Sequence, residues 1–493
     1  MNKKTIYITT AIDYVNAKPH VGQAVEKVQA DVLARFQRDV RKNDVYFLTG
    51  SDENSLKNVQ AAKKEGLPIQ ELVDKNAEYF KALKKNLNLS YDQFFRTTEK
   101  KHFDGVQKFW NSFKQEDIYK KNYKGLYCVG CEEFKLEKDL VDGKCPEHET
   151  VPEIVEEENY FFKLSSYQDE LFELISSDKL QIIPDFRKNE VLSFIKSGLN
   201  DFSISRSKKR AEGWGVPVPD DQGQIMYVWV DALSNYITGL DYASEGELYK
   251  KYWEESDERI HVIGKGILRF HAVYWIAMLL SAGLPLPTKI ISHEYLTINN
   301  QKISKSLGNV ILPEELVQKF GTDGARYILL SSLPFSKDGD ISWDKMIEKY
   351  NADLANNLGN LVQRVLSMIN KYEIKISHDK NYFSELLEET EAEELPVAKI
   401  IYDTHLQGFD YDGALQSIWK LIDESNVFID EKKPWALSKS GETIELERVL
   451  NVSYWQIFAI ADLLLPFIPE TSEKIKNQLK TLKPEGIFPR IEK

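Results

Sequence analysis

The sequence is poor in cysteine, with 3 among 493 residues, and this scarcity excludes a framework of disulfides. It also lacks any apolar run that approaches the ~20 residues of a membrane-spanning helix. Its first residues, MNKKTIYITTAIDYV, contain too short an apolar run for a signal peptide and continue like a β-strand. We therefore expect a cytoplasmic protein with no membrane partner.

Positive charge is in deficit as well, because 64 lysines and arginines face 77 aspartates and glutamates, for a net charge of −13. That balance excludes a nonspecific coat for nucleic acids, and we expect no DNA partner. It still permits local basic patches, such as residues 206–210 (RSKKR). The chain is too long for one ordinary core, so we expect about two to four domains.

The cysteines that are present lie close together, in a pattern that indicates a metal site. Three thiols and one imidazole are spaced as two knuckles, C-x2-C-x13-C-x2-H, formed by Cys128, Cys131, Cys145 and His148. Gly130 and Gly143 allow the tight turns that direct the thiolates inward. Four such ligands leave no open position, so we predict one structural Zn²⁺. The alternative is a chance cluster of reduced cysteines.

Two stretches have the pattern of an α/β domain. A buried strand at residues 5–10, a helical pattern at 20–38 and an apolar run at 45–49 form a βαβ unit, which begins a parallel sheet. The second stretch, residues 226–332, contains MYVWV, HVIG, a helix around residues 271–281 and KIIS.

The rest of the chain differs in pattern from these two stretches. Residues 118–225 are irregular and contain the knuckles, whereas helical patterns dominate at 351–372, 395–425 and 442–467. We predict an α/β protein with a Rossmann-type parallel sheet, which a zinc-knuckle insertion splits and an all-α helical bundle follows. The predicted segments are 1–117, 118–225, 226–342 and 343–493.

The tetrapeptide PHVG, at residues 19–22, lies where the first strand gives way to the helix. A helix N-terminus offers N–H groups and a partial positive charge to an anion. His20 can donate to a phosphate oxygen, and Gly22 allows a planar group to approach the backbone. Taken alone, the tetrapeptide is more typical of an ordinary strand-to-helix turn.

The segment QKISKSLGN, at residues 301–309, concentrates positive charge and hydroxyl groups but contains no histidine, cysteine or carboxylate. Lys302 and Lys305 can reach a triphosphate, and Ser304 and Ser306 can donate hydrogen bonds. The lack of a general base suits a nucleophile that is already a carboxylate. The alternative is a solvated surface turn.

Together these motifs resemble those of the methionyl-tRNA synthetases, which are class I aminoacyl-tRNA synthetases. PHVG resembles the HIGH signature, and KISKS resembles the KMSKS signature. The order of the family's motifs is kept from about residue 5 to about residue 470 in AIDYVNAKPHVGQA, LTGSDENS, the cysteine knuckle, MYVWVDALSNY, GKGILRFH, QKISKSLGN, NNLGNLVQR and DEKKPW. The resemblance implies attack of the methionine carboxylate on the α-phosphate of ATP, with Mg²⁺, and then transfer of methionine to tRNA(Met).

The resemblance also implies roles for individual residues. The implied catalytic residues are His20, Lys302 and Lys305. Implied ATP contacts are His20, Gly22, Gln23, Lys302, Ser304, Lys305 and Ser306. The implied methionine pocket, in which Asp52 pairs with the ammonium group, comprises Ile12, Tyr14, Asp52, Trp229, Tyr236 and His271. Positions that match readers of the CAU anticodon are Asn360, Arg364, Pro434 and Trp435. The knuckle resembles the single, zinc-bearing type.

Without the resemblance, Trp229, Tyr236 and Trp435 are more typical of core residues, and His271 of a satisfied core histidine. The sequence also departs from the family near the nucleotide. A second histidine is usual where Gln23 stands, and the positions of Asn54, Gly266 and Glu294 differ too.

Two further readings stay open for the function. One is a tRNA-binding relative that has lost catalysis, although the retained His20, Lys302, Lys305 and Asp52 speak against it. The other is a different nucleotidyl-transferring enzyme with HIGH-type motifs, or a synthetase for another amino acid. The lack of a large editing insertion disfavours the leucine, isoleucine and valine enzymes.

Overall fold

The structure is a computed structural model that describes residues 3–130, 133–135, 137–146, 149–303, 308–377 and 394–492. The chain divides into two compact units. The first comprises Met1–Pro19, Val40–Lys85 and Leu89–His293, and the second His20–Asp39, Asn86–Asn88 and Glu294–Lys493. Across the described ranges, no helix is long and apolar enough to span a membrane.

The first unit is built around a parallel sheet, as the sequence predicts. Its strand order is β2-β3-β1-β13-β14-β8, with β4 also beside β3, and every one of these pairings is parallel. The strands are β1 (Thr5–Thr10), β2 (Asp13–Tyr14), β3 (Asp44–Asp52), β4 (Gln93–Arg96), β8 (Gln181–Ile183), β13 (Glu258–Gly264) and β14 (Lys289–His293). Apolar runs form these strands because both faces of a parallel sheet are covered.

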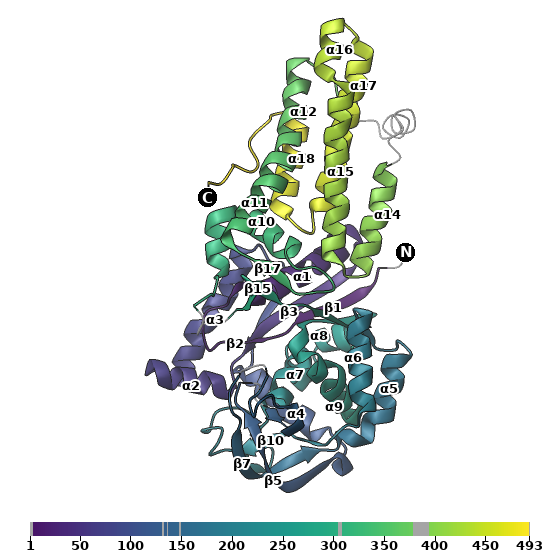
Figure 1. Ribbon diagram of the computed structural model, residues 1–493. Helices are drawn as coiled ribbons and strands as arrows, with labels where there is room; N and C mark the ends of the chain where they lie inside the picture. Colours follow the sequence, from purple (N-terminus) through teal and green to yellow (C-terminus); the bar gives the residue numbers. More distant parts are fainter. Residues whose placement is uncertain are drawn as a thin grey trace. The chain divides into compact units, whose positions relative to one another are not determined.

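Besides this sheet, the first unit contains helices (Figure 1). They are α2 (Leu56–Glu65), α3 (Ile69–Asn86), α4 (Lys100–Asn111), α5 (Gln168–Ser176), α6 (Asp185–Lys196), α7 (Val228–Thr238), α8 (Glu247–Tyr249) and α9 (Trp275–Ala282). The run MYVWV spans the end of strand β12 (Asp221–Met226) and the first turn of α7. Large buried side chains such as Trp253 and Trp275 fill the core.

Two smaller antiparallel sheets lie in the stretch between the two α/β segments. One pairs β5 (Ile118–Cys128) with β7 (Glu153–Phe162) along most of their length and adds β6 (Glu133–Lys135) and β9 (Phe202–Ser203). The other comprises β10 (Ser205–Ser207), β11 (Pro217–Val218) and β12. The same stretch also contributes β8, the edge strand of the parallel sheet.

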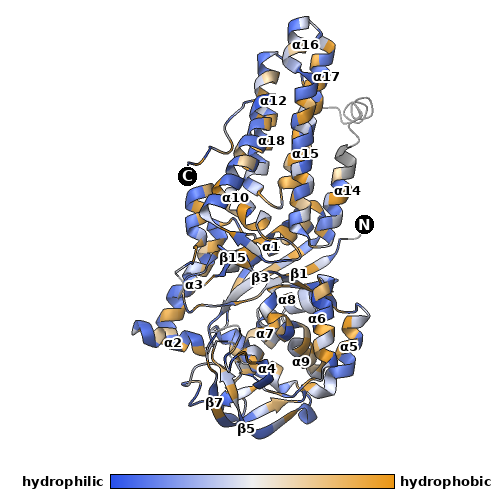
Figure 2. Cartoon of the chain, viewed as in Figure 1, coloured by the Kyte–Doolittle hydropathy of each residue, from blue (hydrophilic) through white to orange (hydrophobic). Residues whose placement is uncertain are grey.

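The second unit is mainly helical. Its helices are α1 (Val21–Arg35), α10 (Pro313–Ser331), α11 (Trp343–Lys349), α12 (Asn360–Lys371), α14 (Glu394–Gln407), α15 (Tyr411–Lys432), α16 (Pro434–Ser440), α17 (Thr443–Leu464) and α18 (Pro469–Thr481). Figure 1 shows α12, α15 and α17 running side by side. Figure 2 shows hydrophobic and hydrophilic residues alternating along these helices, as in an amphipathic bundle.

Helix bounds differ from the sequence prediction at several points. The first helix, predicted to reach residue 38, ends at Arg35 and passes into a wider turn over Phe36–Val40. The single pattern predicted at 395–425 is two helices, because Asp410 caps α15 by accepting the Gly413 N–H at 2.9 Å.

A buried arginine joins α1 to the helices that follow it much later in the chain. Arg326 of α10 forms a fully buried ion pair with Asp31 of α1, with 2.7 Å between Nη1 and Oδ2. Its guanidinium also donates to the carbonyls of Leu87, Pro466 and Phe467. The PHVG helix therefore packs within the helical unit.

Candidate active site

His20 caps the first helix through its Nδ1 nitrogen. Its Nδ1 accepts the Gly22 backbone N–H at 3.1 Å, while its own backbone N–H donates to Gln23 Oε1 at 3.0 Å. Because Nδ1 is an acceptor, the proton of the neutral ring is on Nε2. The helix start thus combines an imidazole N–H with the partial positive charge of the helix N-terminus.

This cap explains the residue types at two nearby positions, Gly22 and Gln23. A Cβ at Gly22 would lie 3.1 Å from the His20 ring, so a larger residue would displace the imidazole. Gln23 completes a reciprocal capping arrangement with its side chain, which explains a glutamine where the resemblance leads us to expect histidine. A glutamine three residues after the cap is a pattern that the sequence itself displays.

The two signature motifs meet within the second unit. The Val21 N–H donates to the Ile311 carbonyl at 3.0 Å, and the Ile303 side chain lies next to Gly22. Lys302 is an exposed residue of β16 (Gln301–Lys302), which pairs with β15 (Leu296–Ile298) through a turn of two left-handed asparagines. The predicted Ser304, Lys305 and Ser306 lie outside the described residues.

The residue that ends the segment QKISKSLGN is hydrogen-bonded to a residue near its start. Asn309 Nδ2 donates to the Lys302 carbonyl at 3.0 Å, and β15 also pairs with β17 (Gly339–Ile341). Asp340 accepts the Asn300 N–H at 2.5 Å, which secures the hairpin turn. Both ends of the loop are therefore held by hydrogen bonds.

Three of the predicted pocket residues lie at strand ends in the first unit. The parallel register pairs Tyr14 of β2 with Asp52 of β3. Asp52 is 3% exposed, and its backbone carbonyl accepts Asn58 Nδ2 at 2.9 Å. Ile12 approaches the same strand, since a Cβ at Gly50 would lie 3.2 Å from its Cγ2. Ligands of open parallel sheets bind at such carboxyl ends.

Tyr236 and His271 are joined by a buried hydrogen bond of 2.7 Å between the hydroxyl and Nε2. His271 Nδ1 lies 2.9 Å from the Ile267 carbonyl, which can only accept. A neutral His271 therefore donates from Nδ1 and accepts the Tyr236 hydroxyl proton at Nε2. Each group is thereby oriented within α7 and the turn before α9.

Beneath this pair lies a second buried histidine, which the sequence analysis did not single out. His261 stacks on Tyr236 with 4.2 Å between ring centroids and accepts the Trp275 indole N–H at 3.3 Å. Its other nitrogen lies 2.6 Å from Thr9 Oγ1. Complete burial, followed by the nearby His271, lowers the pKa of His261 well below its ordinary value. The ring beneath Tyr236 is therefore uncharged at neutral pH.

Trp229 forms the partly exposed side of this aromatic group. Its ring stacks on Phe270 at 3.8 Å with an angle of 6°, and its edge approaches His271. Tyr14 and Trp229 both pack against the core cluster that contains Tyr236. The sequence analysis did not single out Phe270, although this residue directly precedes His271 in GKGILRFH. A carboxylate beside aromatic, uncharged walls suits a zwitterion with an apolar, polarizable side chain.

The predicted anticodon residues fall together on the helical bundle. Asn360 and Arg364 lie one turn apart on α12, and the Arg364 guanidinium is 5.1 Å from the centre of the Trp435 ring. Asp430 of α15 pairs with Arg364 at 2.5 Å. Pro434 is buried at the start of α16, whereas Trp435 is only partly buried. Trp435 is therefore less buried than a typical core residue.

The predicted zinc site is described in part. Cys128 and Cys145 are both buried, while Cys131 and His148 lie outside the described residues. Gly143 has the left-handed backbone, φ 73°, that the knuckle interpretation requires. The Cys145 carbonyl accepts the Glu149 N–H at 2.7 Å, and the Cys145 N–H donates to the Thr150 carbonyl at 2.9 Å. Among the described residues no group of three potential ligands forms a metal site.

Comparisons with known proteins agree with these motifs. A profile of the family described as "tRNA synthetases class I (M)" matches residues 6–151 and 135–366. The methionine–tRNA ligase of Thermotoga maritima is 42% identical, over 95% of this chain and 74% of its own length. That of Brucella suis is 43% identical, over 97% of this chain and 92% of its own length.

The fold agrees with a solved structure of the same group. Mycobacterium tuberculosis methionyl-tRNA synthetase in complex with methionyl-adenylate is 38% identical to this chain and superposes with a TM-score of 0.89. The match covers 99% of this chain and all of that one. The chain therefore belongs to the methionyl family of class I tRNA synthetases.

Proposed function

We propose that this chain activates L-methionine with ATP and transfers it to tRNA(Met), as a ligase that forms aminoacyl-tRNA. The observation that carries the proposal is the approach of the two signature motifs. The Ile303 side chain lies next to Gly22, and the Val21 N–H donates to the carbonyl of Ile311, which follows shortly after the KISKS segment. Between them the two motifs supply a donor histidine and lysines, without a general base. Similarity along nearly the whole chain to methionine–tRNA ligases supports the same reaction.

In the first step, a carboxylate oxygen of methionine attacks the α-phosphorus of ATP, and the bond to pyrophosphate breaks. The carboxylate is already ionised, so no base is needed. His20 Nε2–H donates to the phosphates, while Lys302 and Lys305 supply positive charge where negative charge grows in the transition state. Mg²⁺ bound with ATP supplies further positive charge to the same oxygens.

In the second step, a hydroxyl of the terminal tRNA ribose attacks the carbonyl carbon of methionyl-adenylate. AMP leaves, and the hydroxyl proton is lost to solvent. We assign selection of the tRNA to segment 343–493, where Asn360, Arg364 and Trp435 offer amide, guanidinium and indole groups to unstacked anticodon bases.

Selection of methionine rests on the pocket of the first unit. Asp52 pairs with the ammonium group, and Ile12, Tyr14 and Trp229 surround the rest of the substrate. The oriented Tyr236 and His271 face the thioether, for which an uncharged, aromatic wall is favourable. The low pKa of His261 keeps positive charge away from this wall.

The whole reaction is tested by charging. We expect the purified chain, with ATP, Mg²⁺ and radiolabelled methionine, to attach label to a tRNA(Met) transcript in acid-precipitable form. A transcript whose CAU anticodon is replaced should accept far less label. Normal tRNA binding without any charging would instead favour the noncatalytic relative.

The zinc knuckle belongs to this proposal as a structural element. The donor set of three thiols and one imidazole fits Zn²⁺, and the buried Cys128 and Cys145 with the left-handed Gly143 suit a closed site. A thiolate site in a chain without a disulfide framework suits a reducing compartment, so we place the protein in the cytoplasm.

We expect one zinc per chain, bound tetrahedrally with Zn–S distances of about 2.3 Å. Elemental analysis and X-ray absorption of protein purified without chelator measure both quantities. Cys145→Ala should lose the metal and loosen residues 118–162 to proteolysis, whereas His405→Ala, outside the knuckle, should keep one zinc. Metal-free native protein would refute this assignment.

A further inference from the structure

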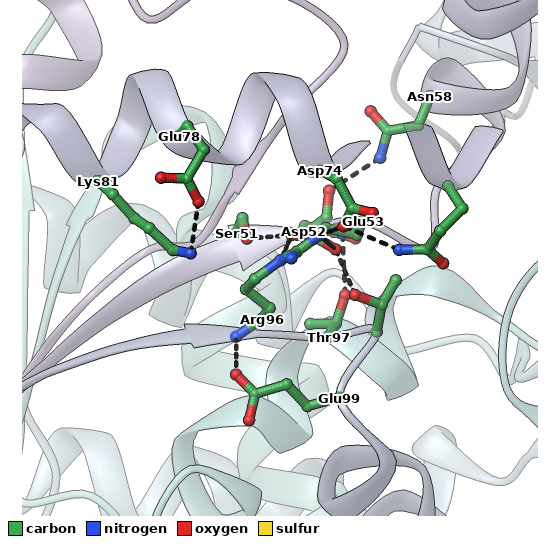
Figure 3. A network of polar contacts seen from close by, with 12 residues as sticks. Ser51, Asp52, Glu53, Asn58, Asp74, Glu78, Lys81, Arg96, Thr97 and Glu99 are labelled. Atoms are coloured by element: carbon green, nitrogen blue, oxygen red, sulfur yellow. Dashed lines mark hydrogen bonds and ion pairs between the residues drawn. The ribbon is translucent and has the colours of Figure 1, made fainter. Parts of the chain in front are cut away.

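A second carboxylate lies directly beside Asp52 and is wholly buried. Glu53, which follows the end of β3, is 0% exposed. Its carboxylate accepts two hydrogen bonds from Arg96, one from Nε at 2.6 Å and one from Nη2 at 2.9 Å. Ser51 Oγ donates to it at 2.6 Å, and Thr98 Oγ1 donates as well. Figure 3 shows Ser51, Glu53 and Arg96 converging beside Asp52.

The backbone on both sides of Asp52 is held by the segment that carries Arg96. The Glu53 N–H donates to Thr97 Oγ1 at 2.9 Å, and the Thr97 N–H donates to the Ser51 carbonyl at 3.3 Å. Asn54 Nδ2 donates to the Thr97 carbonyl at 3.0 Å. Because residues 51, 53 and 54 are all anchored to this segment, the direction of the Asp52 side chain depends on where Arg96–Thr98 lies.

Charge adds a second dependence. Arg96 is the cation paired with buried Glu53, and it also contacts Asp74 of α3. Burial opposes its charge, but the hydrogen bonds and charges of Glu53 and Asp74 leave the pKa of Arg96 above its ordinary value. Removing one member of such a pair leaves an uncompensated buried charge. Glu53 would then either turn away, and move the adjoining backbone, or compete with Asp52 for the substrate ammonium.

We propose that Arg96 is a positioning residue, which acts through Glu53 to orient Asp52 toward the ammonium group of the amino-acid substrate. The proposal rests on the proposed function in one respect, the pairing of Asp52 with that ammonium group. Arg96 itself touches no substrate in this assignment. Substitution of Arg96 should therefore weaken the binding only of ligands that carry the ammonium group. A general loss of stability would instead weaken the binding of all ligands.

Pyrophosphate exchange by Arg96→Gln and Arg96→Lys tests the proposal. We expect the KM for methionine to rise by about tenfold to a hundredfold, as for loss of a hydrogen bond to a charged group, while the KM for ATP changes by less than about twofold. Arg187→Gln is the matched control, because Arg187 is similarly exposed, 16% against 19%, and pairs with Glu190 on α6. It should leave both KM values unchanged.

Two inhibitors separate positioning from a structural role. Methioninol keeps the ammonium group, so its inhibition should weaken in both Arg96 variants in step with the rise in the methionine KM. The desamino analogue 4-(methylsulfanyl)butanoate lacks that group, and its inhibition constant should stay the same. Equal weakening of both inhibitors, or equal rises in KM for methionine and ATP, would overturn the proposal. If Arg96→Gln does not fold, Arg96→Lys carries the test, because it keeps the charge and loses the paired geometry.

Two further variants distinguish a failure of the proposal for Arg96 from a failure of the proposed function. Glu53→Gln combined with Arg96→Gln removes the uncompensated charge, and it should restore part of the methionine KM relative to Arg96→Gln alone. Asp52→Asn should raise the methionine KM while sparing the desamino analogue. If Asp52→Asn leaves the methionine KM unchanged, the assigned role of Asp52 is wrong, whatever the Arg96 variants do.

Discussion

Lys305→Ala should lower the kcat of methionine-dependent pyrophosphate exchange by about 10²–10³-fold while leaving the affinity for methionine nearly unchanged. The physical reason is that, in the proposed mechanism, the charge of Lys305 stabilises the phosphates mainly in the transition state. Lys305 lies outside the described residues, but both ends of its loop are held, at Lys302 by Asn309 and at Ile311 by Val21.

Steady-state kinetics of exchange, with methionine binding measured separately, provide the readout for this variant. Lys100→Ala is a matched control, because Lys100 is exposed and pairs with Asp104 one turn along α4. It should behave like the unchanged protein. A Lys305→Ala variant with normal kcat would remove this lysine from the catalytic machinery.

Trp435→Ala should leave pyrophosphate exchange near normal and reduce kcat/KM for tRNA charging by about tenfold or more. Each lost stack between a base and an aromatic ring is worth about 1–3 kcal/mol, and exchange needs no tRNA. The structure favours this division, since Trp435 is only partly buried and lies against the Arg364 guanidinium. Discrimination against transcripts without CAU should shrink as well.

Measuring both half-reactions and the melting temperature on one preparation checks this expectation. Trp455→Ala is the contrasting variant, because the Trp455 indole donates to the Ser377 carbonyl within the bundle. It should lower the melting temperature and impair exchange and charging together. If Trp435→Ala behaves in the same way, Trp435 supports the bundle and does not read the anticodon.

The parallel sheet was predictable because its strands are apolar runs. Both faces of β1 and β3 are covered, and strands of this kind appear in a sequence as short, continuous apolar runs. The family motifs similarly indicated Tyr14, Asp52, Tyr236 and His271. Their register and hydrogen bonds were not predictable, since Tyr14 meets Asp52 only through the pairing of β2 with β3.

Other features escape sequence patterns because they depend on partners far apart in the chain. Arg326 is a charged residue in a helical pattern, and nothing local indicates that Asp31 and the carbonyls of three other residues surround it. Arg96 is equally ordinary in the sequence until β4 pairs with β3 and places it against Glu53. Gln23 is different, because its spacing from His20 already resembles a helix cap.

The central claim is that the pocket accepts methionine and that the two signature motifs activate it with ATP. Exchange of labelled pyrophosphate into ATP, measured with each of the twenty amino acids and without tRNA, tests this most directly. We predict exchange that depends on methionine and is far weaker with every other amino acid. Exchange that depends on a different amino acid, or no exchange with any of them, would contradict the account.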